Sequence, residues 1–308
     1  MNDLLGAEQL IIKKQYQSGK FPQLSHWIMA ARPRTLPAAI APVVVGAALA
    51  YKDLAFSLVI TIACLVLATL LQIGSNYAND LFDYKKGTDR ADRVGPKRAV
   101  ASGLITPTQM LIGTIAVLLA ALLVGLYLTY IGGIIFFVIG IFCIAAAVMY
   151  TAGPFSLAYN GLGDVAVFIF FGLVAVVGTY YLQAKEITFF VVIAAIGVGA
   201  LAANILVVNN TRDRHTDART GKKTLAVRFG HGFCIYQYIF LLVVGYLCAL
   251  MLMLENIWAF LPLFTIPMAI KRVKELQEHE GTQLNPTLGK TANLLFFYSA
   301  LLGIGLIL

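Results

Sequence analysis

The chain has 308 residues, of which 59% are hydrophobic and only 12% are charged, and its mean hydropathy is +0.82. Soluble globular domains carry about 25% charged residues, so this composition excludes a soluble enzyme and indicates a membrane protein. We attribute the net charge of +8 to membrane topology rather than to nucleic-acid binding, because no soluble basic domain accompanies the apolar segments.

Apolar segments of membrane-spanning length recur along most of the chain. A helix needs about 20 mostly apolar residues to cross roughly 30 Å of hydrocarbon. The sequence therefore predicts an all-α, polytopic membrane protein with about nine transmembrane helices in a single domain, 1–308. The predicted spans are residues 36–50, 54–78, 110–130, 131–150, 165–182, 187–208, 235–254, 258–270 and 294–308.

Basic residues are distributed unequally between the two ends of the predicted spans. If the N-terminus is cytoplasmic, nearly every lysine and arginine falls on the cytoplasmic side, and the exceptions are Lys52 and Lys185. Cytoplasmic loops of membrane proteins carry an excess of these residues. We therefore predict a multi-pass protein of the plasma membrane whose N-terminus and whose loops after the second, fourth, sixth and eighth spans are cytoplasmic.

Two polar segments at the ends of the second and sixth predicted spans share a pattern. The first reads NYANDLFDYKKGTD at residues 76–89, and the second reads VNNTRDRHTDARTGKK at residues 208–223. The pair Asn79 and Asp83 aligns with the pair Asn209 and Asp213 at an offset of 130 residues. This match suggests an internal duplication of about 36–160 and 161–290.

Helical periodicity places the polar residues of each segment on one face of its helix. Side chains three or four residues apart lie on the same face. Each helix end therefore presents a carboxylate pair with an amide one turn deeper. The first face comprises Gln72, Asn76, either Asn79 or Asp80, and Asp83, and the second comprises Leu206, either Asn209 or Asn210, Asp213 and Asp217.

Carboxylates gathered in this way predict a bound cation, because they repel one another unless positive charge lies among them. Oxygen ligands without a histidine and cysteine cluster select a hard ion, and Mg²⁺ commonly binds through a few carboxylates together with substrate phosphates. We predict that the Mg²⁺ ligands are Asp80, Asp83, Asp213 and Asp217. A diphosphate bridged by the metal is the anion that fits, and its predicted contacts are Asn76, Asn79, Lys97, Arg98, Asn209, Lys222 and Lys223.

The motifs Asn79-Asp80-x-x-Asp83 and Asp213-x-x-x-Asp217 resemble those of the UbiA superfamily of intramembrane prenyltransferases. Three further stretches are similar to the branch that prenylates 1,4-dihydroxy-2-naphthoate in menaquinone synthesis. They are ARPRTLPAAIAPVVVG at residues 31–46, DRVGPKRAVASGLI at residues 92–105 and YTAGPFSLAYNGLGDVAVFIFFG at residues 150–172. One departure is Asp89, which follows Asp83 by six residues rather than by the four of many relatives, so its place among the metal ligands stays open.

This resemblance implies a helical bundle around a central cavity that opens laterally to lipid, with Mg²⁺ and a polyprenyl diphosphate held by the aspartate-rich segments. It also implies transfer of the polyprenyl chain to the naphthoate with loss of carbon dioxide, giving demethylmenaquinol. An allylic cation formed on this path could be stabilised by aromatic faces, for which Tyr150 and Phe155 are candidates.

Two other polar residues have both a structural and a functional interpretation. Arg34 is either a topology charge or a contact to the carboxylate of the aromatic acceptor. Asp164 begins an apolar helix, where a carboxylate either caps free backbone N–H groups or contributes to the active site.

Two other function classes fit the sequence less well. A transporter would place its carboxylates near the bilayer midplane, whereas these lie at helix ends. A membrane phosphatidyltransferase would carry an Asp-Gly-x-x-Ala-Arg signature, which the sequence lacks. Within the resembled family, prenylation of 4-hydroxybenzoate or of haem remains the alternative.

Overall fold

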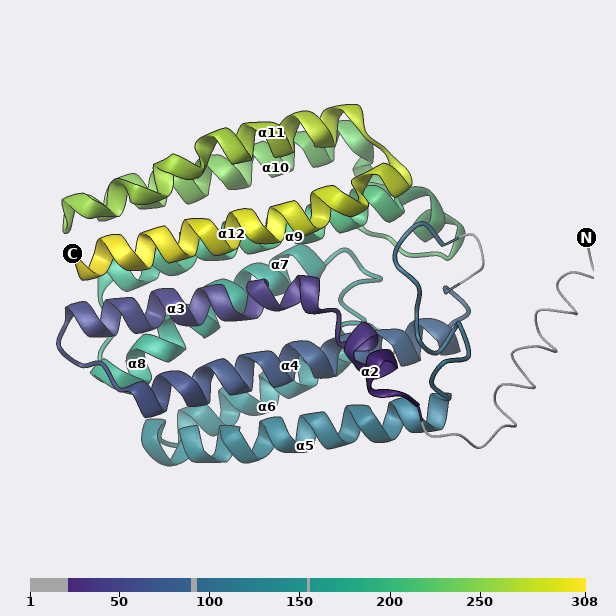
Figure 1. Cartoon of the computed structure of the whole chain (residues 1–308), viewed down its shortest axis with the longest axis horizontal. Helices are drawn as coiled ribbons and strands as arrows, with labels where there is room; N and C mark the ends of the chain where they lie inside the picture. The colour runs from purple at the N-terminus through teal and green to yellow at the C-terminus, as the bar shows by residue number, and fades with distance from the viewer. Residues whose placement is uncertain (1–21, 90–92, 154–155) are drawn as a thin grey trace, which may run out of the picture.

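The computed structural model describes residues 22–89, 93–153 and 156–308, and all regular secondary structure in those residues is helical. The helices form long rods that run side by side (Figure 1). The single-helix rods are α3 (Leu36–Lys52), α4 (Leu58–Lys85), α5 (Pro107–Gly132), α6 (Ile134–Met149), α9 (Phe189–Arg219), α10 (Leu225–Leu252) and α12 (Leu284–Ile307). The all-α prediction is confirmed.

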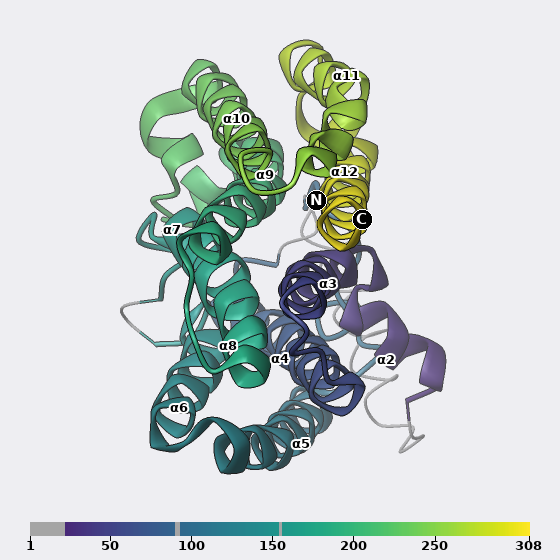
Figure 2. The same cartoon turned by 90° about the vertical axis from the view of Figure 1, so that its left-hand side faces the viewer.

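Two further rods are composite. One joins α7 (Gly163–Val167), the π-helix η2 (Phe168–Val177) and α8 (Gly178–Ala184), and the other joins the 3₁₀ helix η3 (Ile257–Thr265) to α11 (Ile266–Glu278). The short elements are α2 (Leu24–Ala31), η1 (Pro33–Thr35) and η4 (Gly281–Gln283). Figure 2 views the rods end on, with α4, α5 and α6 on one side, α9 to α12 on the other, and α3 and the α7–η2–α8 rod between them.

The number of membrane spans is confirmed only in part. In the described part of the chain, seven helical segments are long and apolar enough to cross a membrane. The apolar helix α6 has only 16 residues, and the η3–α11 rod is not one of the seven. The prediction of nine spans therefore stays a prediction for the segments 131–150 and 258–270.

Local sequence signals explain where several rods begin. Thr106 and Gln109 form a reciprocal capping box at the start of α5, with a proline in the first helical turn, as helix N-termini favour. The side chains of Thr188 and Thr224 accept backbone N–H groups at the starts of α9 and α10. These threonines satisfy N–H groups that have no partner within the helix.

Helix α9 forms the buried centre of the bundle, packed against η2, α10 and α12. Its many glycine and alanine residues allow this close packing. A Cβ atom added to Gly172 on η2 would lie 2.7 Å from the Cα atom of Gly199 on α9. No larger residue fits at either position without moving a helix, and small residues at such crossings are typical of membrane bundles.

Helices α4 and α9 continue through both acidic segments to Lys85 and Arg219, as the predicted helical faces of these segments require. Two other features of the helices differ from the sequence prediction. The fifth span contains ten residues of π-helix, which hydropathy cannot reveal because the composition of this segment remains uniformly apolar. Helix α10 is interrupted at Gly230, whose φ of 80° lies in the left-handed region that glycine adopts without steric cost.

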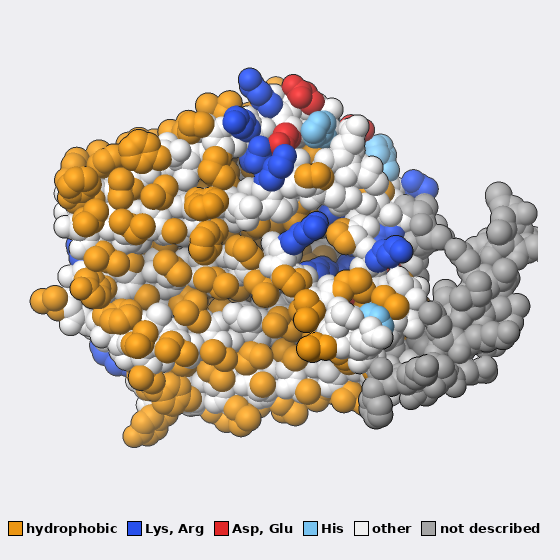
Figure 3. Space-filling view, in the orientation of Figure 1, with side chains coloured by type: hydrophobic (Ala, Val, Ile, Leu, Met, Phe, Trp, Pro, Cys, Tyr) orange, Lys and Arg blue, Asp and Glu red, His pale blue; other side chains and the backbone are white. Residues whose placement is uncertain are grey.

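Charge divides the bundle along its length. In the face shown in Figure 3, hydrophobic side chains cover the left-hand part, and lysine, arginine, aspartate, glutamate and histidine side chains gather toward the right. The C-terminal ends of α4 and α9 lie at that right-hand end (Figure 1). The two acidic segments therefore reach the same end of the bundle, and the side of the membrane that this end faces stays a prediction.

Candidate active site

A cavity of about 990 Å³ lies among α3, α4, α5, α6, the α7–η2–α8 rod and α9. Its lining changes from apolar to polar along α4 and α9, toward the ends of these helices. On α4 it runs from Leu67 and Leu71 to Asp83, and on α9 it runs from Ala202 to Asp217. The apolar part can accept a hydrocarbon chain, and the polar part can bind an anionic or cationic group.

The structure selects among the faces that periodicity left open. On α4 the cavity is lined by Gln72, Asn76, Asn79 and Asp83, and on α9 by Leu206, Asn209, Asn210, Asp213 and Asp217. Asn79 therefore faces the cavity and Asp80 does not. Each helix contributes its amides and carboxylates to the same polar end, as the paired motifs predict.

Asp80 has a different environment from the other acidic residues of the motifs. Its side chain is buried, and its two carboxylate oxygens accept the backbone N–H groups of Ala99 at 2.9 Å and Val100 at 3.1 Å. The carboxylate thus holds the loop that follows α4 against the helix. The predicted contact between Asp80 and a metal has no support in this geometry.

Asp83 is the meeting point of three segments. Its carboxylate accepts hydrogen bonds from Arg98 Nη2 at 3.1 Å and from the Tyr159 hydroxyl at 2.9 Å. The Lys222 Nζ atom lies 3.7 Å from Asp83 Oδ1 and 3.5 Å from Asp217 Oδ1. One ammonium group therefore links the carboxylates of the two motifs.

Asp213 is paired with the residue that precedes it. Arg212 donates to both oxygens of the Asp213 carboxylate, at 2.8 Å and 2.6 Å. The same guanidinium donates to Asn209 at 2.9 Å and to Asn285 of α12 at 3.2 Å. Asn285 in turn donates to the carbonyl of Val94 at 3.1 Å, so Arg212 and Asn285 join α9, α12 and the loop after α4 around the polar end of the cavity.

Tyr159 is a site residue that the sequence analysis missed. Its ring lies 4.0 Å from Lys86 Nζ and 4.9 Å from Lys222 Nζ, measured to the ring centroid. Burial and the nearby Asp83 carboxylate raise the pKa of the Tyr159 hydroxyl, which keeps this hydroxyl protonated as a donor. The only sequence signal for Tyr159 is its position in the stretch 150–172.

The charge state of Lys222 follows from two opposed effects. Burial lowers the pKa of its ammonium group, but the Asp83 and Asp217 carboxylates more than offset this effect and leave the pKa raised. Lys222 is therefore a half-buried cation. Its neighbour Lys223 is exposed and does not line the cavity, and the backbone N–H of Lys223 donates to the carbonyl of Tyr159 at 2.8 Å.

Asp89 lies beside the site but does not line the cavity. It forms ion pairs with Arg93 and, at 3.5 Å, with Arg98. Burial raises the pKa of Asp89 to about 7, and Arg93 opposes this rise. The structure thus places Asp89 among the arginines of the loop rather than on the cavity wall.

Lys86 fastens the segment between α6 and α7 to the end of α4. Its ammonium group donates to the carbonyls of Thr151 at 2.6 Å and Gly153 at 3.2 Å, and to the hydroxyl of Ser156 at 3.2 Å. These three acceptors and the ring of Tyr159 surround the ammonium group of Lys86. Lys86 therefore positions the segment that carries Tyr150 and Tyr159.

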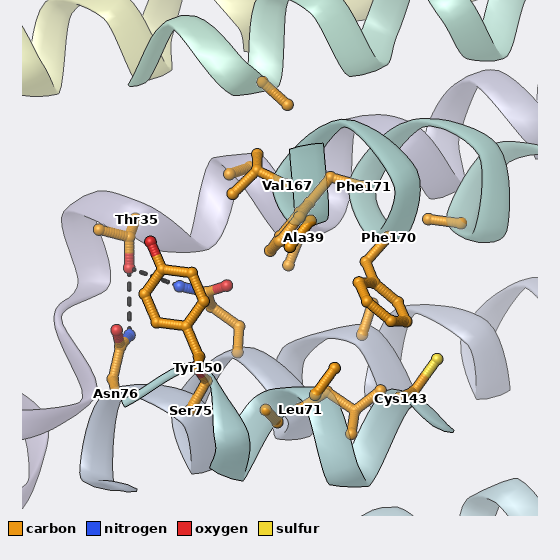
Figure 4. Close-up of a pocket in the computed structure, with 18 of the residues that line it drawn as sticks. Thr35, Ala39, Leu71, Ser75, Asn76, Cys143, Tyr150, Val167, Phe170 and Phe171 are labelled. Atoms are coloured by element: carbon orange, nitrogen blue, oxygen red, sulfur yellow. Dashed lines mark hydrogen bonds between the residues drawn. The ribbon is translucent and has the colours of Figure 1, made fainter. Parts of the chain in front are cut away.

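The turn before α3 carries an unusual arginine. Arg32 has a φ of 53° and a ψ of 69°, and its buried Nη2 has no hydrogen-bond partner within the described residues. Asn76 donates to the hydroxyl of Thr35 at 3.2 Å (Figure 4) and to the carbonyl of Ala31 at 2.9 Å, and these two hydrogen bonds hold this turn on α4. Left-handed backbone in a non-glycine residue costs free energy and is concentrated at functional sites. Arg34 also lines the cavity, but it is exposed.

Some of the remaining predicted site residues line the cavity and others do not. Tyr150 lines the cavity beside Thr35 and Ser75, and Phe170 and Phe171 of the π-helix form part of the wall (Figure 4). Lys97 lines the cavity as well. Asp164 is buried outside the lining and accepts a hydrogen bond from Gln237 at 3.2 Å, so its predicted substrate contact has no geometric support. Phe155 lies outside the described residues.

The donor set at the polar end suits a hard cation that also binds substrate oxygens. Within the described ranges, no three histidine, cysteine, aspartate or glutamate side chains form a group that could hold a metal ion. Asp83 and Asp217, however, are already bridged by one cationic group. Two carboxylates with neighbouring amide oxygens match the way Mg²⁺ binds, because Mg²⁺ usually takes its other ligands from water and phosphate.

Comparison with known proteins adds four findings. Residues 39–301 match the UbiA prenyltransferase family. The chain is 41% identical over 268 residues to the 1,4-dihydroxy-2-naphthoate octaprenyltransferase of Mycobacterium tuberculosis, a match that covers 87% of this chain and 91% of the relative. It is 36% identical to the Escherichia coli protein of the same name, over 88% of this chain and 93% of that protein. The structure of a UbiA homolog from Archaeoglobus fulgidus bound to GPP and Mg²⁺ superposes with a TM-score of 0.64 at 18% identity, covering 90% of this chain and 99% of that chain.

Proposed function

This chain belongs to the UbiA prenyltransferase family, and from that membership we propose that it transfers a polyprenyl chain from an allylic diphosphate to 1,4-dihydroxy-2-naphthoate. The names of its bacterial relatives support this acceptor. The observation that carries the proposal is the convergence of both acidic segments at the polar end of one apolar cavity. A polyprenyl diphosphate has the same division, with an anionic head and a long hydrocarbon tail.

We propose that Mg²⁺ is held by Asp83 and Asp217, with Asn79, Asn209 and Asp213 completing the oxygen-rich wall. When bound, Mg²⁺ would neutralise the charge that develops on the leaving diphosphate. The predicted substrate contacts that line the cavity are Asn76, Asn79, Lys97, Arg98, Asn209, Lys222 and Arg34.

The cations of the chain would assist departure of the diphosphate. Arg98 and Lys222 lie beside Asp83 in the buried part of the site, where charge-assisted hydrogen bonds are strong because water is excluded. In the transition state the bond between the allylic carbon and the diphosphate oxygen breaks, and its electron pair leaves with the oxygen. Donors already in place stabilise this developing charge without reorganisation.

The apolar wall would protect the allylic cation that remains. Water would quench this cation, and the lining of α5, α6 and the π-helix is almost entirely apolar. The rings of Tyr150, Phe170 and Phe171 lie in the cavity wall (Figure 4), and aromatic faces attract cations.

Attack by the naphthoate completes the reaction without a separate proton acceptor on the attacked carbon. The ring carbon that bears the carboxylate forms the new carbon–carbon bond. The carboxylate then leaves as carbon dioxide, and the electrons of the broken bond restore the aromatic ring. We place this carboxylate at Arg32, whose guanidinium lines the cavity and has a buried Nη2 without a hydrogen-bond partner among the described residues.

The decisive assay uses acceptor labelled in its carboxyl carbon, together with a polyprenyl diphosphate and Mg²⁺. Labelled carbon dioxide is expected in proportion to prenylated product, and EDTA is expected to abolish turnover. Prenylated 4-hydroxybenzoate that keeps its carboxylate, with no turnover of the naphthoate, would refute the acceptor assignment but not the diphosphate chemistry. Full turnover in EDTA would refute the metal assignment.

Location and orientation complete the proposal. The chain is a multi-pass membrane protein. We place it in the plasma membrane with its acidic helix ends at the cytoplasmic face, because nearly all of its lysine and arginine residues map to that side.

A further inference from the structure

Lys222 occupies the position between the two motifs where a shared cation would bind. Its Nζ lies 3.7 Å from Asp83 Oδ1 and 3.5 Å from Asp217 Oδ1. These carboxylates belong to α4 and α9, which are brought together from distant parts of the chain. The ammonium group is therefore the direct ionic link between the two halves of the site.

The backbone of Lys222 is fixed, whereas its side chain can move. Its N–H donates to the carbonyl of Asp217 at 3.0 Å, after Gly221 has turned the chain at a φ of 77°. Thr224 then caps the start of α10. The flexible four-carbon stem of lysine allows the ammonium group to shift by several ångströms about this anchor.

The Tyr159 ring offers the ammonium group an aromatic face on which it can lie after it leaves the carboxylates. Its centroid lies 4.9 Å from Lys222 Nζ, and its hydroxyl donates to Asp83. A cation can leave a carboxylate pair and stay on an aromatic face with less loss of stabilisation than in an apolar environment.

We propose that Lys222 is a displaceable counter-ion that holds the metal site assembled until a divalent cation takes its place. This inference rests on the proposed function, because it concerns the same Asp83 and Asp217 carboxylates. Without positive charge between them, these buried carboxylates would repel each other and separate the ends of α4 and α9. Lys222 supplies that charge from within the chain.

The exchange couples metal binding to recognition of the leaving group. Lys222 must leave the carboxylates when a divalent cation binds there, because two cations cannot share this position without strong repulsion. The displaced ammonium group remains near the polar end of the cavity, which Lys222 lines. It is then free to donate hydrogen bonds to diphosphate oxygens. The same residue therefore opposes binding of the metal alone and favours binding of the diphosphate.

The test compares the full-length wild type with Lys222→Met in detergent, and Lys223→Met serves as the matched control. Calorimetric titration with Mg²⁺ alone should show about tenfold tighter binding to Lys222→Met, because no cation has to be displaced. Titration with inorganic pyrophosphate in saturating Mg²⁺ should show about tenfold weaker binding to the same variant, because a charge-assisted hydrogen bond is lost. Lys223→Met should match the wild type in both titrations. In EDTA, the Tm of Lys222→Met should lie below that of the wild type, and Mg²⁺ should restore it.

A footprint of the wild type tests the exchange without any variant. An amine-acylating reagent, read out by mass spectrometry, should modify Lys222 more when Mg²⁺ is added, while modification of Lys223 stays constant. Addition of pyrophosphate should then protect Lys222.

Three outcomes would overturn the inference. Weaker or unchanged Mg²⁺ binding to Lys222→Met would show that the lysine does not compete with metal. Unchanged acylation of Lys222 on addition of Mg²⁺ would show that it does not move. Absence of Mg²⁺-dependent pyrophosphate binding to both the wild type and Lys222→Met would refute the proposed metal site itself, and this outcome distinguishes failure of the proposed function from failure of the inference.

Discussion

At the scale of single residues, two acidic side chains of one motif, three positions apart, have different tasks. Asp83 lines the cavity and contacts Arg98, Tyr159 and Lys222. Asp80 instead accepts two backbone N–H groups of the following loop. Residues three apart on a helix point about 60° apart, so these two carboxylates lie near one face but can still meet different surroundings. A buried carboxylate that binds backbone donors stabilises the fold, and one that faces a cavity remains available to a ligand.

Substitution separates these two tasks. Asp83→Asn and Asp217→Asn should each lower kcat at least about a hundredfold while the protein stays folded in detergent, because each removes a charge that faces the ligand. Asp80→Asn should lower the Tm, since losing one buried acceptor costs about 1–3 kcal/mol. Steady-state kinetics and thermal unfolding of the three variants provide the measurement. An Asp80→Asn variant with unchanged Tm and the same loss of kcat as Asp83→Asn would identify Asp80 as a metal ligand.

The two arginines of the turn before α3 provide a second comparison. From the sequence, Arg34 is either a topology charge or the partner of the acceptor carboxylate, but Arg32 has the buried Nη2 that lacks a partner among the described residues. We expect Arg32→Ala to raise the KM for the naphthoate roughly ten- to a hundredfold, since a charge-assisted hydrogen bond contributes about 1.5–3 kcal/mol. The KM for the diphosphate should change much less.

Arg34→Ala is the matched variant for that experiment. Its guanidinium is exposed, and exposed charges contribute little, so its KM values should stay within about threefold of the wild type. A large rise in the acceptor KM for Arg34→Ala alone would restore the original assignment. Equal losses toward both substrates for Arg32→Ala would instead indicate a structural or diphosphate-side role.

At the scale of elements, the segment between α6 and α7 is held in place by hydrogen bonds from other parts of the chain. Tyr150 and Tyr159 belong to this segment, and Lys86 from the end of α4 holds it by three hydrogen bonds. The backbone N–H of Lys223 and the side chain of Arg228 hold the carbonyls of Tyr159 and Asn160 from the other side. The segment is therefore fixed between both acidic helix ends.

Removing the three hydrogen bonds of Lys86 should loosen the segment between α6 and α7 without loosening the rest of the protein. Lys86→Met leaves three acceptors without their donor, so hydrogen exchange of amides in residues 156–162 should accelerate and kcat should fall. Lys85→Met is the control, because the exposed Lys85 forms none of these hydrogen bonds. Hydrogen exchange followed by mass spectrometry compares the two variants, and equal exchange in both would show that Lys86 does not hold the segment.

Close helix packing gives a second prediction at this scale. Gly172→Ala should destabilise the protein by about 1–3 kcal/mol, because overpacking a tight contact displaces the backbone. The added Cβ would lie 2.7 Å from the Gly199 Cα. Gly232→Ala on α10 meets no atom within 4 Å and should leave the Tm unchanged or raise it. Thermal unfolding of the two variants in the same detergent provides the measurement. Equal Tm values would contradict the close approach of Gly172 to Gly199.

At the scale of the whole molecule, the bundle has one polar end that carries the site and an opposite end with few charges. At the opposite end, Lys52 at the end of α3 forms ion pairs with Asp53 and with Glu255 from the loop after α10. Tyr180 of α8 donates to Asp53 at 2.6 Å. These contacts close that end and leave the polar groups of the cavity at the other.

The predicted orientation can be measured directly in cells. Single cysteines introduced at Lys52 and Lys185 should react with a membrane-impermeant thiol reagent from outside, whereas a cysteine at Lys97 should react only after permeabilisation. The four native cysteines are buried or half-buried and provide the background control. Equal labelling of positions 97 and 185 in intact cells would contradict the proposed topology.

The sequence by itself determined the class of the protein, the positions of most helices and the identity of the acidic segments. These properties are local, because hydropathy over about 20 residues identifies a span and a period of 3.6 residues identifies a face. Asp83, Asp213 and Asp217 could therefore be named from the sequence alone. The internal duplication rests on the same kind of pattern and stays a prediction.

Only the tertiary structure decided which faces meet. Periodicity allowed either Asn79 or Asp80, and the packing of α4 against the loop at residues 99–100 turned Asp80 away from the cavity. Tyr159, Arg32 and Asn285 could not be predicted as site residues, because each acts across a long sequence separation on a partner that no local pattern specifies. The link between Asp83 and Lys222 shows the physical reason most directly. Each residue lies in a recognisable motif, but their contact exists only because α4 and α9 end at the same side of the bundle.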